Sequence, residues 1–356
     1  AESLIRQGKR VVGVNALDLA SGKKIAIKAS ATIMCAGVWS DQLHERFDLT
    51  PGYNVTMSKG AHIVVPGSAI KSDAGIIVKT PVSVLFLIPW GDKWIVGTTD
   101  TPYKADRTNP VATKEDVEYI IDQANRVLHP KIDAADILGV YAGLRPLVAN
   151  AAGSTTTKLS REHTVDRPVP GFVSIAGGKY TTYRVMGKDV IDLAVNDLRR
   201  IVAESITEKL PAIGADGYFA LVQQSAQLAQ MSGLAQSTIT HLLDRYGSLI
   251  NEIFEIIDAD KKMAEPLTPE LAYLKAEIIY AVTHEGAQSV DDVLSRRTRI
   301  AFEASDGGEA IAATVATLIA PILGWDAAAK KTSVSEFTSH LKNERAALDK
   351  LLTRTR

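Results

Sequence analysis

The stretch Gly171–Arg184, which reads Gly-Phe-Val-Ser-Ile-Ala-Gly-Gly-Lys-Tyr-Thr-Thr-Tyr-Arg, constrains the fold of this chain more than any other. Its apolar run Phe172–Ile175 follows a Pro-Gly turn and is typical of a buried strand. Gly177 and Gly178 permit positive φ, and apolar residues then recur at helical spacing. That helical face comprises Tyr183, Met186, Val190, Leu193, Ala194 and Leu198. The sequence therefore predicts a strand, a glycine turn and the N-terminus of a helix.

The predicted turn has the chemistry of an anion site. A helix N-terminus presents unpaired N–H groups and a partial positive charge, and Lys179 and Arg184 add cations. Thr181 or Thr182 can cap the helix. An ordinary tight strand–helix connection has the same local pattern, so this stretch alone leaves both interpretations open.

Length and charge bound the remaining possibilities. A chain of 356 residues predicts two or three domains, and a net charge of -1 gives no electrostatic footprint for nucleic acid. Cys35 is the only cysteine, so no disulfide can form within the chain and a reducing compartment is expected. Because Cys35 lies in the apolar run Ala31–Ala36, we expect a small core residue rather than a nucleophile. Neither a signal peptide nor a transmembrane helix is expected.

The first 48 residues predict a hairpin followed by a buried strand. Val11–Asp18 and Lys24–Lys28 flank a turn, and Ala31–Ala36 is typical of a strand that is covered on both faces. Such a strand usually lies late in a doubly wound sheet, after strand–helix units that cover it. We therefore expect the chain to begin part-way through a domain.

The region from Pro51 to Pro170 predicts a mixed or antiparallel sheet. Its short β-type runs are Tyr53–Met57, His62–Val65, Gly75–Val78, Val82–Pro89 and Trp94–Gly97. Lys114–Leu128 predicts an amphipathic helix capped by Thr113. A strand is expected over Asp136–Leu144, ending in a turn at Arg145-Pro146.

From about Asp216 the pattern indicates helices only. Helix starts are predicted at Thr268-Pro269-Glu270, at Ser289 and at Ser333, and helix ends at Gly307-Gly308 and Gly324. Pro211–Gly217 is the predicted linker into this helical region.

Several motifs, taken in order, resemble those of FAD-dependent glycerol-3-phosphate dehydrogenases, the quinone-linked respiratory enzymes. They are Cys35-Ala-Gly-Val-Trp-Ser-Asp41, Ser58-Lys-Gly-Ala-His62, Ile88-Pro-Trp90, Gly97-Thr-Thr-Asp100, Tyr141-Ala-Gly-Leu-Arg-Pro146, Arg161, Gly177–Arg184, Thr283-His-Glu-Gly286 and Ser289–Arg299. The likeness covers essentially the whole chain. One departure is that the Gly-x-Gly-x-x-Gly unit that seats the FAD pyrophosphate in that family has no match in this sequence.

The resemblance implies a fold of the α+β or α/β class. It comprises a truncated, doubly wound FAD-binding domain, an inserted mixed-sheet substrate domain and an all-α C-terminal domain. The expected bounds are residues 1–48 with 171–205, residues 49–170, and residues 212–356.

The resemblance also implies oxidation of sn-glycerol 3-phosphate to dihydroxyacetone phosphate, with hydride passing from C2 to flavin N5 and electrons to a membrane quinone. Arg145 and Arg161 would bind the substrate, since a guanidinium can hold phosphate through two parallel hydrogen bonds. Lys179 would act as a catalytic and substrate-binding residue, with its ammonium near the flavin and the substrate oxygens. His62 would take the hydroxyl proton, or Arg145 would instead stabilise the developing alkoxide. Without the resemblance, ion pairs with surface carboxylates would explain the two arginines.

Further roles follow from the same resemblance. Thr99 would lie near flavin or substrate, and FAD would contact Gly37, Trp39, Lys59, Gly60, Gly178, Lys179, Thr181 and Thr182. The remaining histidines are interpreted as structural, and Arg296, Arg297 and Arg299 as a solvated or salt-bridged face rather than a lipid site. No His or Cys pattern has metal-ligand spacing.

The expected partners are glycerol 3-phosphate, a quinone, the membrane surface and a second copy of the chain. The expected location is cytoplasmic and peripheral on the inner face of the cell membrane. Two alternatives stay open at this point. One is a related FAD-dependent oxidase that passes electrons to oxygen. The other is a catalytically incomplete fragment whose helical domain serves as a binding module.

Overall fold

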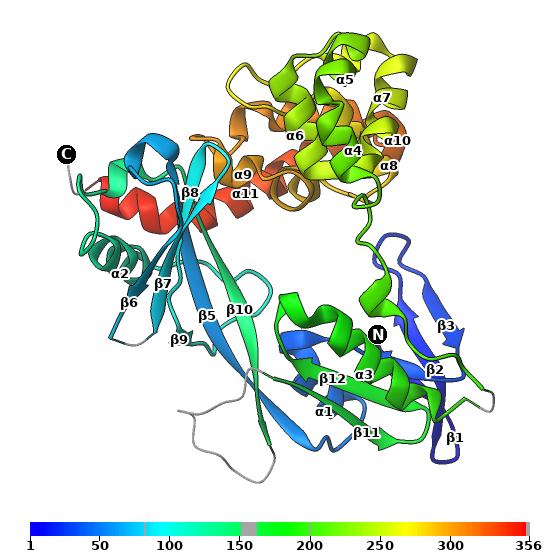
Figure 1. Ribbon diagram of the computed structural model, residues 1–356. Helices are drawn as coiled ribbons and strands as arrows, with labels where there is room; N and C mark the ends of the chain where they lie inside the picture. The colour runs from blue at the N-terminus through cyan, green and yellow to red at the C-terminus, as the bar shows by residue number, and fades with distance from the viewer. Residues whose placement is uncertain (82, 151–161, 199–200, 354–356) are drawn as a thin grey trace. The chain divides into compact units, whose positions relative to one another are not determined.

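The computed structural model describes residues 1–81, 83–150, 162–198 and 201–353, which form two compact units (Figure 1). Unit 1 comprises Ala1–Gly60, Asp100–Pro110 and Ala142–Leu210. Unit 2 comprises Ala61–Thr99, Val111–Tyr141 and Pro211–Arg356. Strands β5 (Tyr53–Pro66) and β10 (Gly139–Asn150) contribute residues to both units. The three-part division that we expect from the sequence stays a prediction.

Unit 1 contains two small sheets. The antiparallel sheet β1-β2-β3 comprises Ser3–Gln7, Arg10–Leu17 and Lys24–Lys28, which confirms the predicted hairpin and adds β1. The mixed sheet β11-β12-β4 comprises His163–Val169, Phe172–Gly177 and Thr32–Met34, with β12 antiparallel to β11 and parallel to β4. The helices are α1 (Ser40–Arg46) and α3 (Tyr183–Val195).

The packing of α3 on β12 confirms the local prediction for Gly171–Arg184. Val190 and Ala194 of the helix form one buried cluster with Val173 and Ile175 of the strand, each of the four at most 5% exposed. The core of this unit therefore places the end of β12 directly before the first turn of α3.

The prediction for Ala31–Ala36 is wrong in part. Strand β4 covers only Thr32–Met34, and of these only Met34 is buried. Cys35 follows the end of the strand and is exposed rather than a core residue. The physical reason is that β4 lies at the edge of its sheet among the described residues, so its side chains are covered less than those of β12.

A six-stranded sheet has the order β10-β5-β8-β7-β6, and β9 (Thr101–Pro102) pairs with β5. Its other strands are β6 (Ile76–Lys79), β7 (Val84–Trp90) and β8 (Lys93–Gly97), which pair antiparallel. The two runs that we predict at Tyr53–Met57 and His62–Val65 are joined in the single strand β5. Leu85 and Leu87 of β7 are fully buried, whereas Phe86 and Ile88 are exposed, which is the expected alternation.

Strand β10 corrects a second expectation. Arg145 and Pro146 lie inside this strand, where we predict a turn. Proline has no N–H to donate, but β10 is the outermost strand of its sheet, and an edge strand tolerates that loss. Helix α2 (Lys114–Ala124) begins as predicted, with Thr113 and Asp116 forming a capping box.

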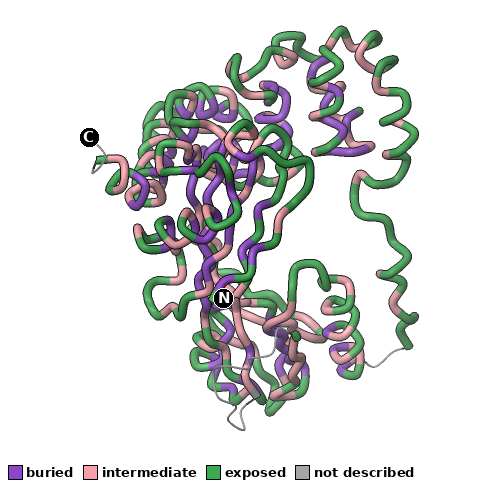
Figure 2. The backbone as a smooth tube through the Cα atoms, turned by 60° about the vertical axis from the view of Figure 1, so that its left-hand side comes forward, coloured by how far each residue is buried: buried purple, intermediate pink, exposed green. Residues whose placement is uncertain are grey.

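The last third of the chain is helical, and its buried residues appear in purple in Figure 2. Its helices are α4 (Tyr218–Gln223), α5 (Ser225–Ser232), α6 (Gln236–Tyr246), α7 (Ile250–Ala259), α8 (Lys275–Thr283), α9 (Ile300–Glu303), α10 (Ala312–Leu323) and α11 (Ala327–Leu352), with a π-helical turn at Asp292–Arg297. Gly324 ends α10 in the left-handed conformation, as predicted.

Two predicted helix starts are wrong. No helix begins at Thr268, because α8 starts later, at Lys275, where the Glu277 carboxylate accepts a hydrogen bond from the Leu274 N–H. Ser333 lies inside α11, where its hydroxyl accepts from the buried Val290 N–H at 3.0 Å. The cap of α11 is Asp326, which accepts from the Ala329 N–H at 2.7 Å.

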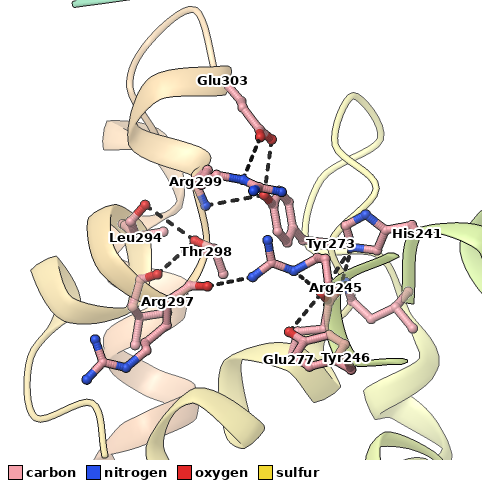
Figure 3. A network of polar contacts seen from close by, with 12 residues as sticks. His241, Arg245, Tyr246, Tyr273, Glu277, Leu294, Arg297, Thr298, Arg299 and Glu303 are labelled. Atoms are coloured by element: carbon pink, nitrogen blue, oxygen red, sulfur yellow. Dashed lines mark hydrogen bonds and ion pairs between the residues drawn. The ribbon is translucent and has the colours of Figure 1, made fainter. Parts of the chain in front are cut away.

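A buried ionic network joins α6 to α8 (Figure 3). The fully buried carboxylate of Glu277 accepts from His241 Nε2 at 3.0 Å and from the Tyr246 hydroxyl at 3.0 Å. Arg245 Nε lies 3.3 Å from the same carboxylate, and its Nη2 donates to the Arg297 carbonyl. Burial, and then the charge of Glu277, raise the pKa of Tyr246. Each charged group in this network therefore has a compensating partner, as burial requires.

Asp197 forms the corresponding ionic contact of unit 1, at the C-terminal end of α3. It is 5% exposed and pairs with Arg10 at 3.1 Å and with Arg167 at 2.6 Å. Hydrogen bonds from Arg167 lower the pKa of Asp197 to about 2. Because the pKa is lowered in the folded protein, the contact stabilises the fold at pH values above the ordinary pKa of an aspartate. This contribution is lost as the pH falls from about 4 to 2.

We expect Asp197→Asn to lower the free energy of unfolding at pH 7 by about 2 kcal/mol, because one pKa unit corresponds to roughly 1.4 kcal/mol. Acidification from pH 7 to pH 3 should also lower the free energy of unfolding less in the variant than in the wild-type protein. Urea unfolding at pH 7 and at pH 3 measures both effects. Asp258→Asn is the matched control, because Asp258 forms an exposed ion pair with Lys261. Equal losses in the two variants would contradict this account.

Candidate active site

Two glycine turns lie at the same edge of the mixed sheet of unit 1. Strand β12 leads through Gly177 and Gly178 to α3, and the parallel strand β4 leads through Gly37 to α1. Gly177 and Gly178 have φ of 78° and 81°, and a Cβ on Gly178 would lie 2.5 Å from Met186 Sδ. The carboxyl ends of parallel strands are where α/β folds bind ligands. Both turns therefore have the placement of a ligand site.

The residues after the double glycine are open to solvent. Lys179, Thr181 and Tyr180 are exposed, Tyr180 by 93%. Thr182 occupies the cap position of α3, but its hydroxyl donates to the Lys179 carbonyl at 3.0 Å instead of capping the helix. Arg184, in the first turn of α3, donates a hydrogen bond to the Thr207 carbonyl. The exposed N-terminus of α3 beside Lys179 therefore has the chemistry of an anion site.

The early turn offers a second exposed surface. Gly37 has a φ of 54°, a Cβ there would meet no atom within 4 Å, and Trp39 is 44% exposed. Arg107 fixes this turn, since it donates to the Val38 carbonyl and forms a two-point contact with Asp41. That hydrogen-bonded guanidinium lowers the pKa of Asp41. Arg107 could not be predicted from the sequence, because its partner Asp41 lies 66 positions away and no local pattern joins them.

Arg145 belongs to a second group of polar side chains in unit 1. Its Nη1 lies 3.6 Å from Asp100 Oδ1, and the Ser58 hydroxyl donates to the same carboxylate oxygen. These three residues come from three separate motifs, Ser58–His62, Gly97–Asp100 and Tyr141–Pro146. The Arg145 side chain remains 33% exposed. An anion could therefore reach a guanidinium whose orientation Asp100 helps to set.

His62 lies in unit 2 with residues from the same three motifs. It pairs across the sheet with Gly97, and its ring stacks on that of Tyr141 at 4.9 Å between centroids, with the planes 11° apart. Burial raises the pKa of Tyr141 to about 12. Thr99 is 3% exposed, and its hydroxyl accepts from the Ala61 N–H at 2.9 Å. Thr99 thus holds the strand beside His62.

The remaining predicted site residues are Lys59, Gly60 and Arg161. Lys59 is buried, 6% exposed, and Gly60 beside it is buried too. Arg161 lies outside the described residues. The roles predicted for Arg145, Lys179, His62, Thr99 and the FAD contacts stay predictions, because their geometry is compatible with those roles without testing them.

Residues interpreted as structural have structural contacts. His44 is buried and its Nε2 lies 3.2 Å from the Ser174 hydroxyl, and burial lowers its pKa. His163, His241 and His340 contact carboxylates. Arg296 pairs with Asp291 and Asp292, Arg297 donates to the Glu285 carbonyl, and Arg299 pairs with Glu303 and covers the Trp90 ring. Arg296 and Arg299 are therefore salt-bridged, whereas Arg297 is held by a backbone carbonyl.

Within the described ranges, no helix combines the length and the apolar character that a membrane span needs.

Comparison with known proteins places these features in a family. Residues 1–193 match the family model described as FAD dependent oxidoreductase, and residues 205–330 match the C-terminal domain of alpha-glycerophosphate oxidase. The glycerol-3-phosphate dehydrogenase of Bacillus halodurans, solved in complex with FAD, superposes with a TM-score of 0.82 at 26% identity over 96% of this chain and 68% of that chain.

Curated relatives agree with these matches. Glycerol-3-phosphate dehydrogenase 2 of Mycobacterium tuberculosis is 45% identical, and the glycerol-3-phosphate dehydrogenase of Mycobacterium leprae is 44% identical, each over 342 residues. These alignments cover 96% of this chain and 58% of each relative, so the chain spans less than two thirds of their length. The sheets, the glycine turns and the helical region match the same fold, and the chain belongs to the FAD dependent oxidoreductase family.

Proposed function

We propose that this protein acts in the FAD-dependent oxidation of sn-glycerol 3-phosphate to dihydroxyacetone phosphate. One observation carries the proposal: three motifs about 40 residues apart bring the polar side chains of Ser58, Asp100 and Arg145 together in unit 1. Within unit 2, residues of the same three motifs place His62 against Gly97 and Tyr141. The names of the relatives at 44% and 45% identity support the same substrate.

We propose that Arg145, Lys179 and Arg161 bind the substrate phosphate and hydroxyl groups. Glycerol 3-phosphate is a small dianion, so several convergent cations are needed to bind and orient it. Arg145 is supported by its partial exposure and by its contact with Asp100, which limits the orientations of the guanidinium. Lys179 is supported by its place in the exposed turn before α3.

We propose His62 as the group that takes the proton from the C2 hydroxyl. Imidazole has a suitable pKa for this transfer near neutral pH. The stacked Tyr141 ring supports the role, because it limits rotation of the imidazole. Arg145 is the alternative, acting by stabilising the developing alkoxide.

FAD would be held at the two glycine turns. Gly37 and Trp39 would contact it at the first turn, and Gly178, Lys179, Thr181 and Thr182 at the second. Lys59 and Gly60, which precede the proposed base His62 in the sequence, are further proposed contacts. When bound, FAD supplies the two-electron acceptor for the hydrogen at C2. The resemblance to quinone-linked enzymes supports a membrane quinone as the next acceptor, a peripheral cytoplasmic location at the inner face of the membrane, and a homodimer.

The proposed function predicts a spectral change on adding substrate. Anaerobic addition of glycerol 3-phosphate to the FAD-loaded protein should bleach the flavin absorbance at about 450 nm and yield dihydroxyacetone phosphate. Glycerol, which lacks the phosphate, should bleach it far less at equal concentration. A flavin that is bound but unaffected by glycerol 3-phosphate would reject the proposal.

One alternative acceptor has support of its own. Residues 205–330 match a domain named for alpha-glycerophosphate oxidase, which favours testing oxygen as the acceptor. Stoichiometric hydrogen peroxide under air would indicate an oxidase. Turnover that requires an added quinone, with little peroxide, would indicate the dehydrogenase.

A further inference from the structure

An aromatic column runs from the proposed base into the helical region of unit 2. The His62 ring stacks on Tyr141 at 4.9 Å, and the Tyr141 ring contacts Phe302 at 5.1 Å between centroids, tilted by 52°. Phe302 lies in α9, more than 150 residues beyond Tyr141. The two ring contacts therefore connect a strand residue, through a second strand, to a helix.

Two glycines make this column close-packed. A Cβ on Gly97 would lie 2.2 Å from His62 Cδ2, so the imidazole occupies the space that a side chain there would fill. A Cβ on Gly139 would lie 2.5 Å from the Phe302 carbonyl oxygen. Neither glycine has a positive φ, so close approach rather than backbone conformation requires glycine at both positions.

The column leaves His62 little rotational freedom. Gly97 sets how deeply the imidazole can lie on the sheet, and Tyr141 stacks face to face with it at an angle of 11°. The Tyr141 ring in turn contacts the Phe302 ring, and the Phe302 backbone approaches Gly139 closely. A base must be held near its productive geometry, and misplacement by about 1 Å can lower a rate by roughly 10²-fold.

We propose that Phe302 is a positioning residue, through which the helical region fixes the ring orientation of His62 by way of Tyr141. This inference rests on the proposed role of His62 as the base. It assigns to α9 a part in the reaction that acts through Tyr141 and His62.

The test compares leucine and tyrosine at position 302 in the FAD-loaded protein. We expect Phe302→Leu to lower kcat per bound flavin by roughly tenfold with KM nearly unchanged, because orientation affects the reacting geometry rather than phosphate binding. Phe302→Tyr keeps an aromatic ring and should retain kcat. Phe337→Leu is the matched control, since Phe337 is 1% exposed in the helical core outside the column, and it should keep kcat while losing stability.

Nuclear magnetic resonance supplies a readout that does not depend on activity. The His62 ring-proton signal, identified by its loss in His62→Gln, should lie upfield because of the Tyr141 ring and should move in Phe302→Leu but not in Phe337→Leu. An unmoved signal, or equal kcat in the two leucine variants, would overturn the positioning role. If His62→Gln keeps the wild-type kcat, the base assignment fails, and the signal shift alone decides whether Phe302 positions the ring.

Discussion

Replacing Arg145 by alanine should lower kcat/KM for glycerol 3-phosphate by about 10³-fold, which corresponds to about 4 kcal/mol. The loss is expected mainly in KM, because the guanidinium would hold the phosphate in both the ground state and the transition state. Removing Arg145 also leaves the Asp100 carboxylate near the bound dianion without its 3.6 Å partner. Steady-state kinetics of the FAD-loaded variant measure the effect.

Two further variants separate this role from a general charge effect. Arg145→Lys keeps the charge but cannot form the two parallel hydrogen bonds, so it should recover only part of kcat/KM. Arg126→Ala removes an exposed arginine that lies 3.8 Å from Asp122, and it should leave the kinetics unchanged. Kinetics of Arg145→Ala that match those of Arg126→Ala would reject phosphate binding by Arg145.

Replacing Glu277 by glutamine should lower the free energy of unfolding by about 3–5 kcal/mol. The carboxylate is fully buried and accepts from His241, from Tyr246 and from the Leu274 N–H, while Arg245 lies 3.3 Å away. The amide leaves the Arg245 charge without its counter-charge and turns one acceptor into a donor that faces other donors. Denaturant unfolding monitored by helical circular dichroism measures the loss.

Glu265→Gln provides the comparison for Glu277. Glu265 pairs with Lys275 at 2.5 Å, but its side chain is 55% exposed, so its replacement should cost less than about 1 kcal/mol. A similar small loss in Glu277→Gln would show that the buried network does not hold α6 and α8 together.

Features set by neighbouring residues could be predicted from the sequence. Thr113 caps α2 because its partner Asp116 is three positions away, and Gly324 ends α10 through its own φ of 67°. The strand, double glycine and helix of Gly171–Arg184 follow from spacing within a single stretch. In each case the interaction that forms the feature lies inside the sequence window that predicts it.

Features set by sheet order or by distant partners could not be predicted. Pro146 lies within β10 because β10 is an edge strand, which depends on how six strands are ordered. Asp326 rather than Ser333 caps α11, since Ser333 is engaged by Val290, 43 positions away. Of the site, the sequence suggests His62 and Arg145 through their motifs, but the contacts with Tyr141, Gly97 and Asp100 appear only in the fold.

We propose that Arg145, Arg161 and Lys179 together bind one small phosphorylated alcohol. A crystal structure of the FAD-loaded protein with glycerol 3-phosphate tests it most directly. We expect Arg145, Arg161 and Lys179 to lie within hydrogen-bond distance, about 3 Å, of oxygen atoms of a single substrate molecule. Substrate bound elsewhere, or these three side chains facing solvent on different surfaces, would contradict it.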